Sequence, residues 1–321
     1  MTYQPPFTVS LNVLRLSQNI SHAIGMIFGE MMDVPPVTLR KQNSIKTIQA
    51  SLAIEGNTLS REQIIHILEG KRVIGPKKDV IEVKNALRVE EFDNLNPLSI
   101  KDLLSAHRVL MAGLIEENGQ WRRRNVGIFD GLKVSHVAPQ AKRIRVLMES
   151  LFDYLARDTQ TPWLIKACLF HYELEFIHPF LDGNGRMGRL WQHLLLTKKN
   201  QLFKYIPVEE LIKDSQEEYY RILGECDRSG DATLFIEYSL TQILQSLEKY
   251  REATRSVING PCSRLDYARR FLTDRSFARK DYFQIFKNIS SATASRDLDS
   301  GVRKGALSRR DEKNQAMYRF T

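Results

Sequence analysis

Residues 163–189, WLIKACLFHYELEFIHPFLDGNGRMGR, predict a helix, a glycine-rich loop and a second helix. The first part, WLIKACLFHYELEFI, carries apolar side chains around most of a helical circumference, which is typical of a helix buried at the centre of a domain. This helix is expected to end at His178, because the residue before a proline is disfavoured in the right-handed helical region. Residues 182–185 then form the loop, and a second helix is expected from Arg186.

Helical periodicity dominates the rest of the chain. Apolar residues recur at spacings of three and four in residues 11–29, 44–55, 60–69, 100–115, 142–157, 187–199 and 232–250. The main exception is VGIFDGLKV, residues 126–134, where Asp130-Gly131 separates two short β-compatible runs and predicts a type I′ hairpin. The expected fold class is therefore mainly α, with one small β-hairpin.

The composition, 42% hydrophobic and 26% charged, is that of an ordinary soluble globular protein. The stretch MTYQPPFTVS has neither the basic start nor the apolar core of a signal peptide, and no run approaches the ~18 apolar residues of a membrane span. We therefore expect a cytoplasmic protein without a membrane partner. Cys168, Cys226 and Cys262 are widely spaced and odd in number, which favours neither a disulfide framework nor a cysteine metal site.

The loop and the second helix carry groups that suit a nucleotide. Unpaired N–H groups at a helix start, together with the positive end of the helix dipole, bind phosphate. Arg186 and Arg189 stand on one helical face and can add two forks of donors. Asp182 offers a hard oxygen ligand for Mg²⁺, and His178 has the proton affinity of a general base near neutral pH. A glycine turn alone would also fit a plain helix connection, but the full set favours a phosphate site.

This segment, HPFLDGNGRMGR, resembles the signature of the Fic family of nucleotidyl transferases. The resemblance implies an all-helical core over roughly residues 100–225 and transfer of AMP from ATP to a hydroxyl of a target protein. It also implies that His178 deprotonates that hydroxyl and that Asp182 holds Mg²⁺ between phosphates. The same resemblance assigns the anion hole to Gly183, Asn184 and Gly185, and the polyphosphate to Arg186 and Arg189. In the Doc-type branch a lysine replaces the second glycine, so Gly185 favours AMP transfer over phosphoryl transfer.

An upstream segment, SLAIEGN at residues 51–57, predicts a helix end at Gly56. Glu55 falls at the margin of the apolar stripe of this helix, where a carboxylate needs a partner. A last-turn glutamate that reaches solvent is the simpler interpretation. Ser51, Glu55 and Gly56, however, match the inhibitory motif of the Fic family, (S/T)xxxE(G/N). The match implies that Glu55 pairs with Arg189 and prevents productive seating of the ATP γ-phosphate.

The predicted hairpin precedes the motif at the distance where Fic proteins carry a target-docking flap. An exposed strand edge there could pair with an extended target segment, although a hairpin without a role would fit as well. Trp121 is interpreted as a core anchor and residues 122–124, RRR, as a solvated basic run; no role is assigned to them. The other histidines have no paired ligand spacing, so no transition-metal site is expected.

The last sixty residues carry most of the net positive charge: residues 262–321 hold 14 Lys+Arg against 7 Asp+Glu, a balance of +7, whereas the whole chain holds 47 against 38, a balance of +9. Three short helices and a two-stranded tip follow one another there, an order that resembles a winged helix-turn-helix domain. Ser291, Thr293, Ser295 and Arg296 suit phosphates and base edges, so duplex DNA is a candidate partner. Winged helices also dock proteins, and that alternative stays open.

The expected domains are an N-terminal helical region with the inhibitory helix (1–95), a Fic catalytic core (96–258) and a winged helix-turn-helix domain (259–321). Two functions fit them. The first is a protein adenylyltransferase that uses ATP and Mg²⁺ and is autoinhibited by Glu55. The second is a DNA-binding regulator whose Fic core senses a nucleotide. His178 and Asp182 favour the enzyme, because a sensor needs no base. A homodimer is left open.

Overall fold

The computed structural model describes the chain in ranges separated by short gaps. These ranges are 4–30, 35, 37–90, 95–130, 133–258, 261–272, 275–286, 289–312 and 315–321. The chain consists of two compact units. Unit 1 comprises Met1–Gly29 and Lys41–Glu248, and unit 2 comprises Glu30–Arg40 and Lys249–Thr321. Residues 259 and 260, where the sequence predicts the domain boundary, lie outside the described ranges, so that boundary stays a prediction.

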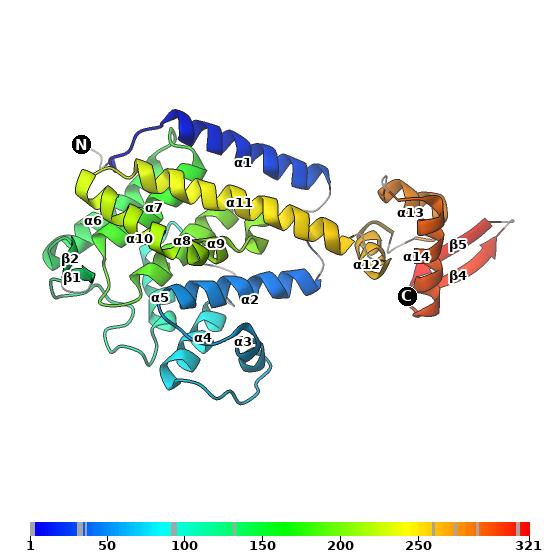
Figure 1. Ribbon diagram of the computed structural model, residues 1–321, viewed down its shortest axis with the longest axis horizontal. Helices are drawn as coiled ribbons and strands as arrows, with labels where there is room; N and C mark the ends of the chain where they lie inside the picture. Colours follow the sequence, from blue (N-terminus) through cyan, green and yellow to red (C-terminus); the bar gives the residue numbers. More distant parts are fainter. Residues whose placement is uncertain are drawn as a thin grey trace. The chain divides into compact units, whose positions relative to one another are not determined.

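Helices make up most of both units (Figure 1). The α-helices are α1 (Leu11–Gly29), α2 (Val37–Ile54), α3 (Arg61–Leu68), α4 (Lys77–Glu90), α5 (Ile100–Leu110), α6 (Ile144–Arg157), α7 (Trp163–Ile177), α8 (Asn184–Lys199), α9 (Val208–Asp214), α10 (Gln216–Ser229), α11 (Thr233–Ile258), α12 (Pro261–Leu272), α13 (Arg279–Ile285) and α14 (Ser291–Arg303). Two 3₁₀ turns, η1 (Ala141–Arg143) and η2 (Gln201–Tyr205), precede α6 and α9. The strands are β1 (Gly127–Asp130), β2 (Lys133–Val137), β3 (Phe277–Ala278), β4 (Leu307–Glu312) and β5 (Gln315–Phe320). The prediction of a mainly α-helical fold is confirmed.

The eight helices predicted in unit 1 from apolar spacing are all present, but α4, α9 and α10 were not predicted. Helix α4 shows why the spacing of apolar residues can fail to predict a helix. Several of its buried side chains are polar, among them Asp79, Glu82 and Asn85, so the 3,4 spacing of its inward face is not a spacing of apolar residues. A buried polar face is recognised only once its partners are known.

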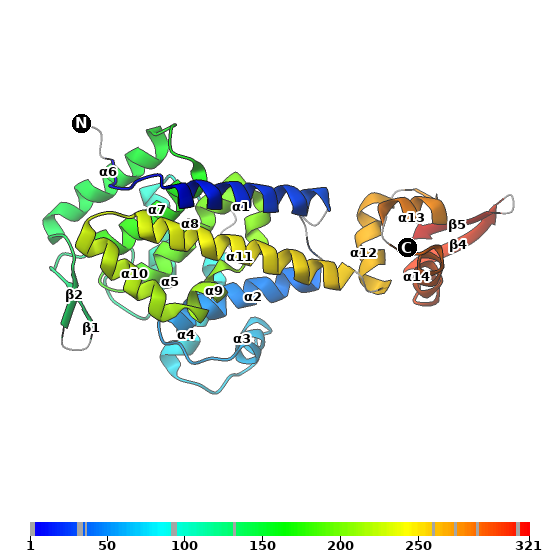
Figure 2. The ribbon, with the colours of Figure 1, turned by 45° about the horizontal axis from the view of Figure 1, so that its top comes forward.

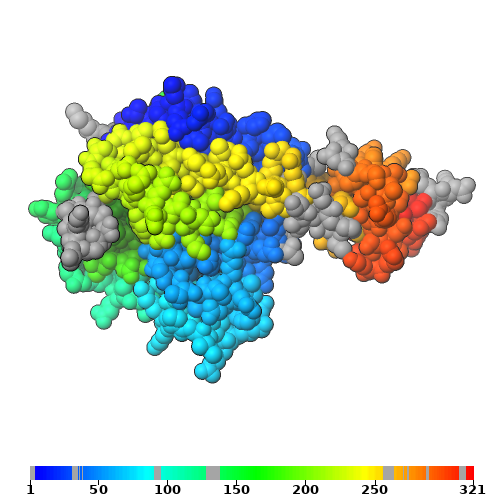
Figure 3. Space-filling view, viewed as in Figure 1, coloured from blue at the N-terminus to red at the C-terminus, as the bar shows by residue number. Residues whose placement is uncertain are grey.

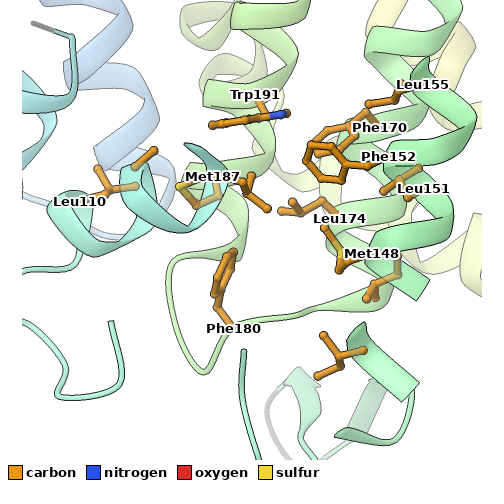
Figure 4. Packing of buried hydrophobic residues seen from close by; sticks show 14 of the residues in the cluster. Leu110, Met148, Leu151, Phe152, Leu155, Phe170, Leu174, Phe180, Met187 and Trp191 are labelled. Atoms are coloured by element: carbon orange, nitrogen blue, oxygen red, sulfur yellow. The ribbon is translucent and has the colours of Figure 1, made fainter. Parts of the chain in front are cut away.

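The centre of unit 1 is the pair α7 and α8, joined by the glycine-rich loop. Helix α7 is buried on nearly every side, as its sequence predicts. Figure 4 shows Phe170 and Leu174 of α7 facing the same interior as Met187 and Trp191 of α8. Burial of these large side chains at ~25 cal/mol per Å² of apolar area holds the two helices together. The loop between them therefore has rigid supports at both ends.

Helix α8 begins two residues earlier than the sequence predicts, at Asn184 instead of Arg186. A side chain at Gly188 is excluded, since an added Cβ would lie 2.7 Å from the His171 ring and 3.3 Å from Glu175 Oε1. The small residue lets α8 approach α7 closely. This close approach brings the first turns of α8 against the end of α7.

Unit 1 also contains the helix pair α1 and α11 and the hairpin β1–β2. Helix α1 lies along α11 in both ribbon views (Figures 1 and 2), and Asn12 donates to Glu237 at 2.9 Å. The hairpin β1–β2 is antiparallel, with Gly127 opposite Val137 and Asp130 opposite Lys133, so the predicted hairpin is present. Asp130, predicted as the first residue of the turn dipeptide, is instead the last residue of β1 and pairs with Lys133. Residues 131 and 132 lie outside the described ranges, so the type I′ turn stays a prediction.

Unit 2 contains the helices α12, α13 and α14 and a three-stranded antiparallel sheet in the order β3-β5-β4. Figure 2 shows β4 and β5 as one long hairpin beside α13 and α14. The three helices and the two-stranded tip are as predicted; the short strand β3 was missed, because a pair of residues carries no alternation pattern. Arg264 of α12 forms a two-pronged ion pair with Asp297 of α14 (2.5 and 2.8 Å), and Tyr282 of α13 donates to the same carboxylate.

On the face shown in Figure 3, α1, α10, α11 and the segment α2–α4 form a continuous surface over unit 1. Within the described ranges, no helix combines the length and the apolar character that a membrane crossing requires.

Candidate functional site

His178 ends helix α7 and is half-buried. Its backbone is left-handed, with φ 49° and ψ 59°, and it is the one non-glycine residue of the described ranges with positive φ. Its ring Nδ1 lies 3.3 Å from the Glu175 carbonyl oxygen, which can only accept a hydrogen bond. In the neutral ring this contact favours the proton on Nδ1 and the lone pair on Nε2. That tautomer has the basic nitrogen that proton abstraction requires.

The loop after His178 is held from inside by Asn184 and His107. The Asn184 side chain is buried and bonds both ends of Phe180: it accepts from the backbone N–H and donates to the carbonyl, each at 2.9 Å. The Asn184 side chain therefore holds the loop and is not placed to contact a ligand. The ring of His107 stacks on that of Phe180 with centroids 3.7 Å apart.

His107 fixes the position of the glycine-rich loop. Its Nδ1 accepts the Gly119 N–H at 2.8 Å, so the proton of the neutral ring is on Nε2, which donates to the Asp182 carbonyl at 2.9 Å. Burial lowers the pKa of His107 to about 4, so the ring is neutral at physiological pH. The sequence identified His107 only as one of several histidines without a ligand pattern, because its partners lie 12 and 75 residues away.

Asp182 and Arg186 are bonded to each other at the start of α8. Asp182 Oδ1 accepts from the Gly183 N–H at 2.6 Å and from Arg186 Nη2 at 2.8 Å. Its other oxygen has no hydrogen-bond partner among the described residues, and the side chain is 44% exposed. An exposed carboxylate oxygen beside a helix N-terminus fits one ligand position of Mg²⁺. Within the described ranges, no cluster of three or more His, Cys, Asp or Glu side chains could hold a metal ion by itself.

Arg186 is also tied to helix α4, which sequence reasoning missed. Its Nη1 donates to Glu82 Oε1 at 2.9 Å, and the side chains of this pair are 4% and 3% exposed. Glu82 Oε2 accepts from Asn57 Nδ2 at 2.8 Å, so the chain just after Glu55 is joined to Arg186 through one carboxylate. Arg186 Nε is buried and has no hydrogen-bond partner among the described residues. No spacing rule could have paired Glu82 with a residue 104 positions away.

Arg189 is 1% exposed and meets the end of helix α2. Its Nη2 donates to Glu55 Oε1 at 2.7 Å and to the Ser51 carbonyl at 3.0 Å, and its Nε donates to Ser51 Oγ at 3.1 Å. The structure thus brings together the three residues that the sequence links through the Fic motifs. Burial by itself lowers the pKa of Arg189, but the Glu55 carboxylate outweighs that effect and the pKa is raised, so the guanidinium stays charged.

The Glu55 carboxylate also covers the loop glycine Gly185. A Cβ added at Gly185 would lie 2.4 Å from Glu55 Oε1 and 3.1 Å from Arg189 Nη1. Arg189 Nη1 is buried and has no hydrogen-bond partner among the described residues. Glu55 directly follows helix α2, which ends at Ile54, and the next residue is Gly56, whose φ of 87° suits glycine. A carboxylate thus lies against Gly185 and Arg189, two residues expected to contact phosphate.

Glu175 is a second carboxylate near Arg189. Burial raises the pKa of Glu175 to about 7, and the attraction of Arg189 offsets this only in part. Tyr219 donates to Glu175 Oε1 at 3.4 Å and lies 3.0 Å from His171 Nε2. Burial lowers the pKa of His171 to about 3, so this ring is neutral. The sequence places Glu175 one helical turn before His178, but its charge state depends on burial and was not predictable.

The raised pKa of Glu175 predicts a pH dependence of stability. In the unfolded chain this carboxyl has an ordinary pKa near 4.5, so between about pH 4.5 and 7 the folded protein keeps a proton that the unfolded chain has lost. The stabilisation is complete below pH 4.5 and disappears as the pH rises through 7. The substitution Glu175→Gln imitates the protonated form at every pH. Thermal unfolding midpoints should show wild type falling relative to Glu175→Gln between pH 5 and 7.5; a constant difference would contradict the prediction.

The interpretation of residues 122–124 as a solvated basic run is wrong for Arg122. The sequence groups it with two neighbours as a solvated basic run, whereas Arg122 is 2% exposed. Arg123 and Arg124 are exposed, as expected. Every hydrogen bond described for the Arg122 guanidinium ends on a backbone carbonyl oxygen, and one of these belongs to His178. The sequence shows three identical residues in a row and has no means of distinguishing the buried one.

The site is therefore a helix–loop–helix. A half-buried histidine and an exposed carboxylate lie between the helices, and the first turns of α8 carry two buried arginines, each with one nitrogen that has no hydrogen-bond partner among the described residues. Such a site defines a class of proteins by its chemistry: a helix N-terminus that suits a polyanion, beside a histidine that suits proton transfer.

Comparisons with known proteins show which family has this kind of site. The model of the Fic/DOC family matches residues 97–196. The crystal structure of a Fic family protein from Desulfovibrio desulfuricans G20 is 38% identical, covers 99% of this chain and 98% of its own, and superposes with a TM-score of 0.75. The chain belongs to the Fic/DOC family.

Curated relatives are more distant. "Protein adenylyltransferase Fic" of Drosophila willistoni is 29% identical over 67% of this chain and 43% of its own length. The protein of the same name from Nematostella vectensis is 28% identical over 75% of this chain and 58% of its own. The chain thus spans about half the length of these relatives and is distantly related to protein adenylyltransferases.

Proposed function

We propose that this protein is an adenylyltransferase that moves AMP from ATP to a hydroxyl side chain of a target protein. The observation that carries the proposal is the pair of buried donors, Arg186 Nε and Arg189 Nη1, that have no hydrogen-bond partner among the described residues and lie in the first turns of α8. A buried N–H group without an acceptor costs free energy, because it has lost its hydrogen bonds to water. An anion that accepts hydrogen bonds from both guanidinium groups would remove this cost. A polyphosphate supplies such an anion, and His178 lies on the same loop.

The proposed reaction needs few groups from the protein. The acceptor oxygen attacks the α-phosphorus, the bond from that phosphorus to the bridging oxygen breaks, and pyrophosphate leaves. The hydroxyl proton passes to His178 Nε2, the nitrogen favoured as base by the Nδ1 contact with Glu175. The protein therefore contributes position, deprotonation and charge neutralisation.

Gly183, Asn184 and Gly185 offer backbone groups at the helix start, where N–H groups have no intrahelical acceptor. The Gly183 N–H is engaged by Asp182, so Asn184 and Gly185 are the better candidates. Mg²⁺, when bound, would neutralise phosphate charge, and Asp182 is the carboxylate that fits it.

We further propose that the Ser51, Glu55 and Gly56 motif is inhibitory. The Glu55 carboxylate occupies Nη2 of Arg189 and lies over Gly185, so a phosphate oxygen and this carboxylate compete for one place. A carboxylate and a phosphate oxygen about 4 Å apart repel each other by several kcal/mol when water is excluded. ATP would then bind without its γ-phosphate on Arg189 until helix α2 moves or Glu55 is replaced.

The hairpin β1–β2 is proposed as the target-docking flap. It is a two-stranded sheet, so each strand has one edge without a neighbour in that sheet, and an extended target segment could add to it.

The central test is labelling. Purified protein, or its Glu55→Gly variant, is incubated with Mg²⁺, cell lysate and ATP labelled on either the α- or the γ-phosphate. Transfer of the α-label to a protein supports the proposal. Transfer of the γ-label alone would indicate phosphoryl transfer, and absence of both labels from every protein with the Glu55→Gly variant would contradict the enzymatic proposal.

A second candidate function, duplex DNA binding by unit 2, rests on a surface of exposed basic residues. Arg296 of α14 and Arg309, Arg310 and Arg319 of the β4–β5 hairpin are exposed, whereas the buried pair Arg264–Asp297 joins α12 to α14 from inside. This division fits a winged helix-turn-helix, with α14 as the groove-binding helix. A regulator that senses a nucleotide would need this surface but not the base His178.

Binding to DNA should weaken steeply as salt rises. Each neutralised phosphate releases counterions, so the logarithm of the affinity falls with the logarithm of salt by about 0.9 per contact. The full chain with a duplex should lose about one such contact in Arg296→Ala, whereas the matched control Arg145→Ala, exposed on α6, should leave the slope unchanged. Fluorescence anisotropy at several salt concentrations measures both. No binding at low salt, or a salt-independent affinity, would remove DNA as a partner.

A further inference from the structure

Arg122 is a buried cation without a carboxylate partner among the described residues. Its guanidinium donates from Nε to the His178 carbonyl at 2.7 Å, from Nη1 to the Arg124 carbonyl at 2.7 Å and from Nη2 to the Pro139 carbonyl at 2.6 Å. Its own backbone N–H donates to the Pro179 carbonyl at 2.9 Å. Burial is the cause of its lowered pKa, and no carboxylate compensates.

The three carbonyl groups come from three separate segments. Arg124 precedes strand β1, Pro139 follows strand β2, and His178 begins the motif loop. One planar fork thus joins both ends of the hairpin to the residue proposed as base. Charge-assisted bonds of this kind are about twice as strong as neutral ones and fix direction as well as distance. Lysine, a point charge on a flexible stem, cannot reproduce the fork.

The same bonds explain the backbone of His178. A left-handed conformation at a non-glycine residue is unfavourable and persists only where its surroundings impose it. The Arg122 Nε bond fixes the His178 carbonyl, and the Arg122 N–H bond fixes the next carbonyl, that of Pro179. These two bonds hold the backbone from which the His178 side chain projects, and the Nδ1 contact with the Glu175 carbonyl orients the ring.

We infer that Arg122 is a positioning residue, which holds the base His178 and the two ends of the hairpin in one fixed arrangement. Resting on the proposed function, this means that the acceptor and the base that deprotonates it are aligned by one side chain, which bonds to the backbone of His178 and to the two ends of the hairpin. Arg122 should then affect the turnover of AMP transfer and not the binding of ATP, whose donors lie on α8.

The test compares Arg122→Lys with Arg123→Lys in the Glu55→Gly background. Arg123 is the adjacent, exposed arginine and is the matched control. Self-labelling from α-labelled ATP gives kcat and the KM for ATP. We expect Arg122→Lys to lower kcat by roughly 10- to 100-fold, as small misplacements of reacting groups do, with the KM within about twofold and Arg123→Lys unchanged.

Two results would overturn the inference: equal kcat in the two lysine variants, or a loss of ATP affinity in Arg122→Lys as large as its loss of kcat. If neither the background variant nor the control labels, the proposed function itself has failed. If Arg122→Lys does not fold, hydrogen exchange of the unsubstituted protein tests whether the three segments share one anchor. Residues 124–127, 138–141 and 177–180 should then open with one common free energy, and independent opening of these segments would contradict a shared anchor.

Discussion

Replacement of His178 by alanine is expected to reduce AMP transfer by roughly 10² to 10⁴-fold, the contribution of a positioned general base. The fold and the binding of ATP should be nearly unchanged, because the side chain is half-buried at a helix end and the phosphate donors belong to α8. Initial rates of labelling with α-labelled ATP measure the loss, and calorimetric titration with ATP measures binding.

The matched control for this variant is His22→Ala, which removes an exposed imidazole from helix α1. It should label as the unsubstituted protein does. Undiminished labelling by His178→Ala would show that His178 is not the base in the reaction that produces the label.

Replacement of Glu55 by glycine is expected to have an effect of opposite sign. The variant frees Arg189 Nη2 and the space over Gly185, so the γ-phosphate can be seated and labelling of the protein itself and of its target should rise. We expect a rise on the order of 10-fold or more, because a single charge-assisted contact in a desolvated site is worth ~1.5 to 3 kcal/mol. Glu55→Asp, one methylene shorter, should rise less.

Stability provides an independent readout of the same contact. Without Glu55 the buried Arg189 has lost its ion pair, which costs on the order of 3 kcal/mol. The unfolding midpoint of Glu55→Gly should therefore fall in the absence of nucleotide, and ATP should raise it more than it raises that of the unsubstituted protein. A folded Glu55→Gly that labels no better than the unsubstituted protein would contradict the inhibitory proposal.

The double variant Glu55→Gly with His178→Ala separates the two roles. It should bind ATP as well as Glu55→Gly does and transfer nothing. Transfer by the double variant would mean that another group acts as base.

Sequence alone determined the central pair of helices and the residues on the loop between them. Apolar side chains around the whole of α7, a proline after His178 and three glycines within a few residues are local features, and local features are what periodicity and turn chemistry describe. The resemblance to a family added the pairing of Glu55 with Arg189, which no spacing rule supplies, and the structure brings these two side chains to 2.7 Å.

Only the tertiary structure decided how the polar groups around the loop are held. Glu82 on Arg186, His107 on Asp182 and Arg122 on His178 join residues 104, 75 and 56 positions apart. In the sequence each looks like a surface residue, because charged and polar side chains are usually exposed. Their burial is possible only after distant segments have folded together and supplied hydrogen-bond partners, so the information lies in the partners and not in the pattern.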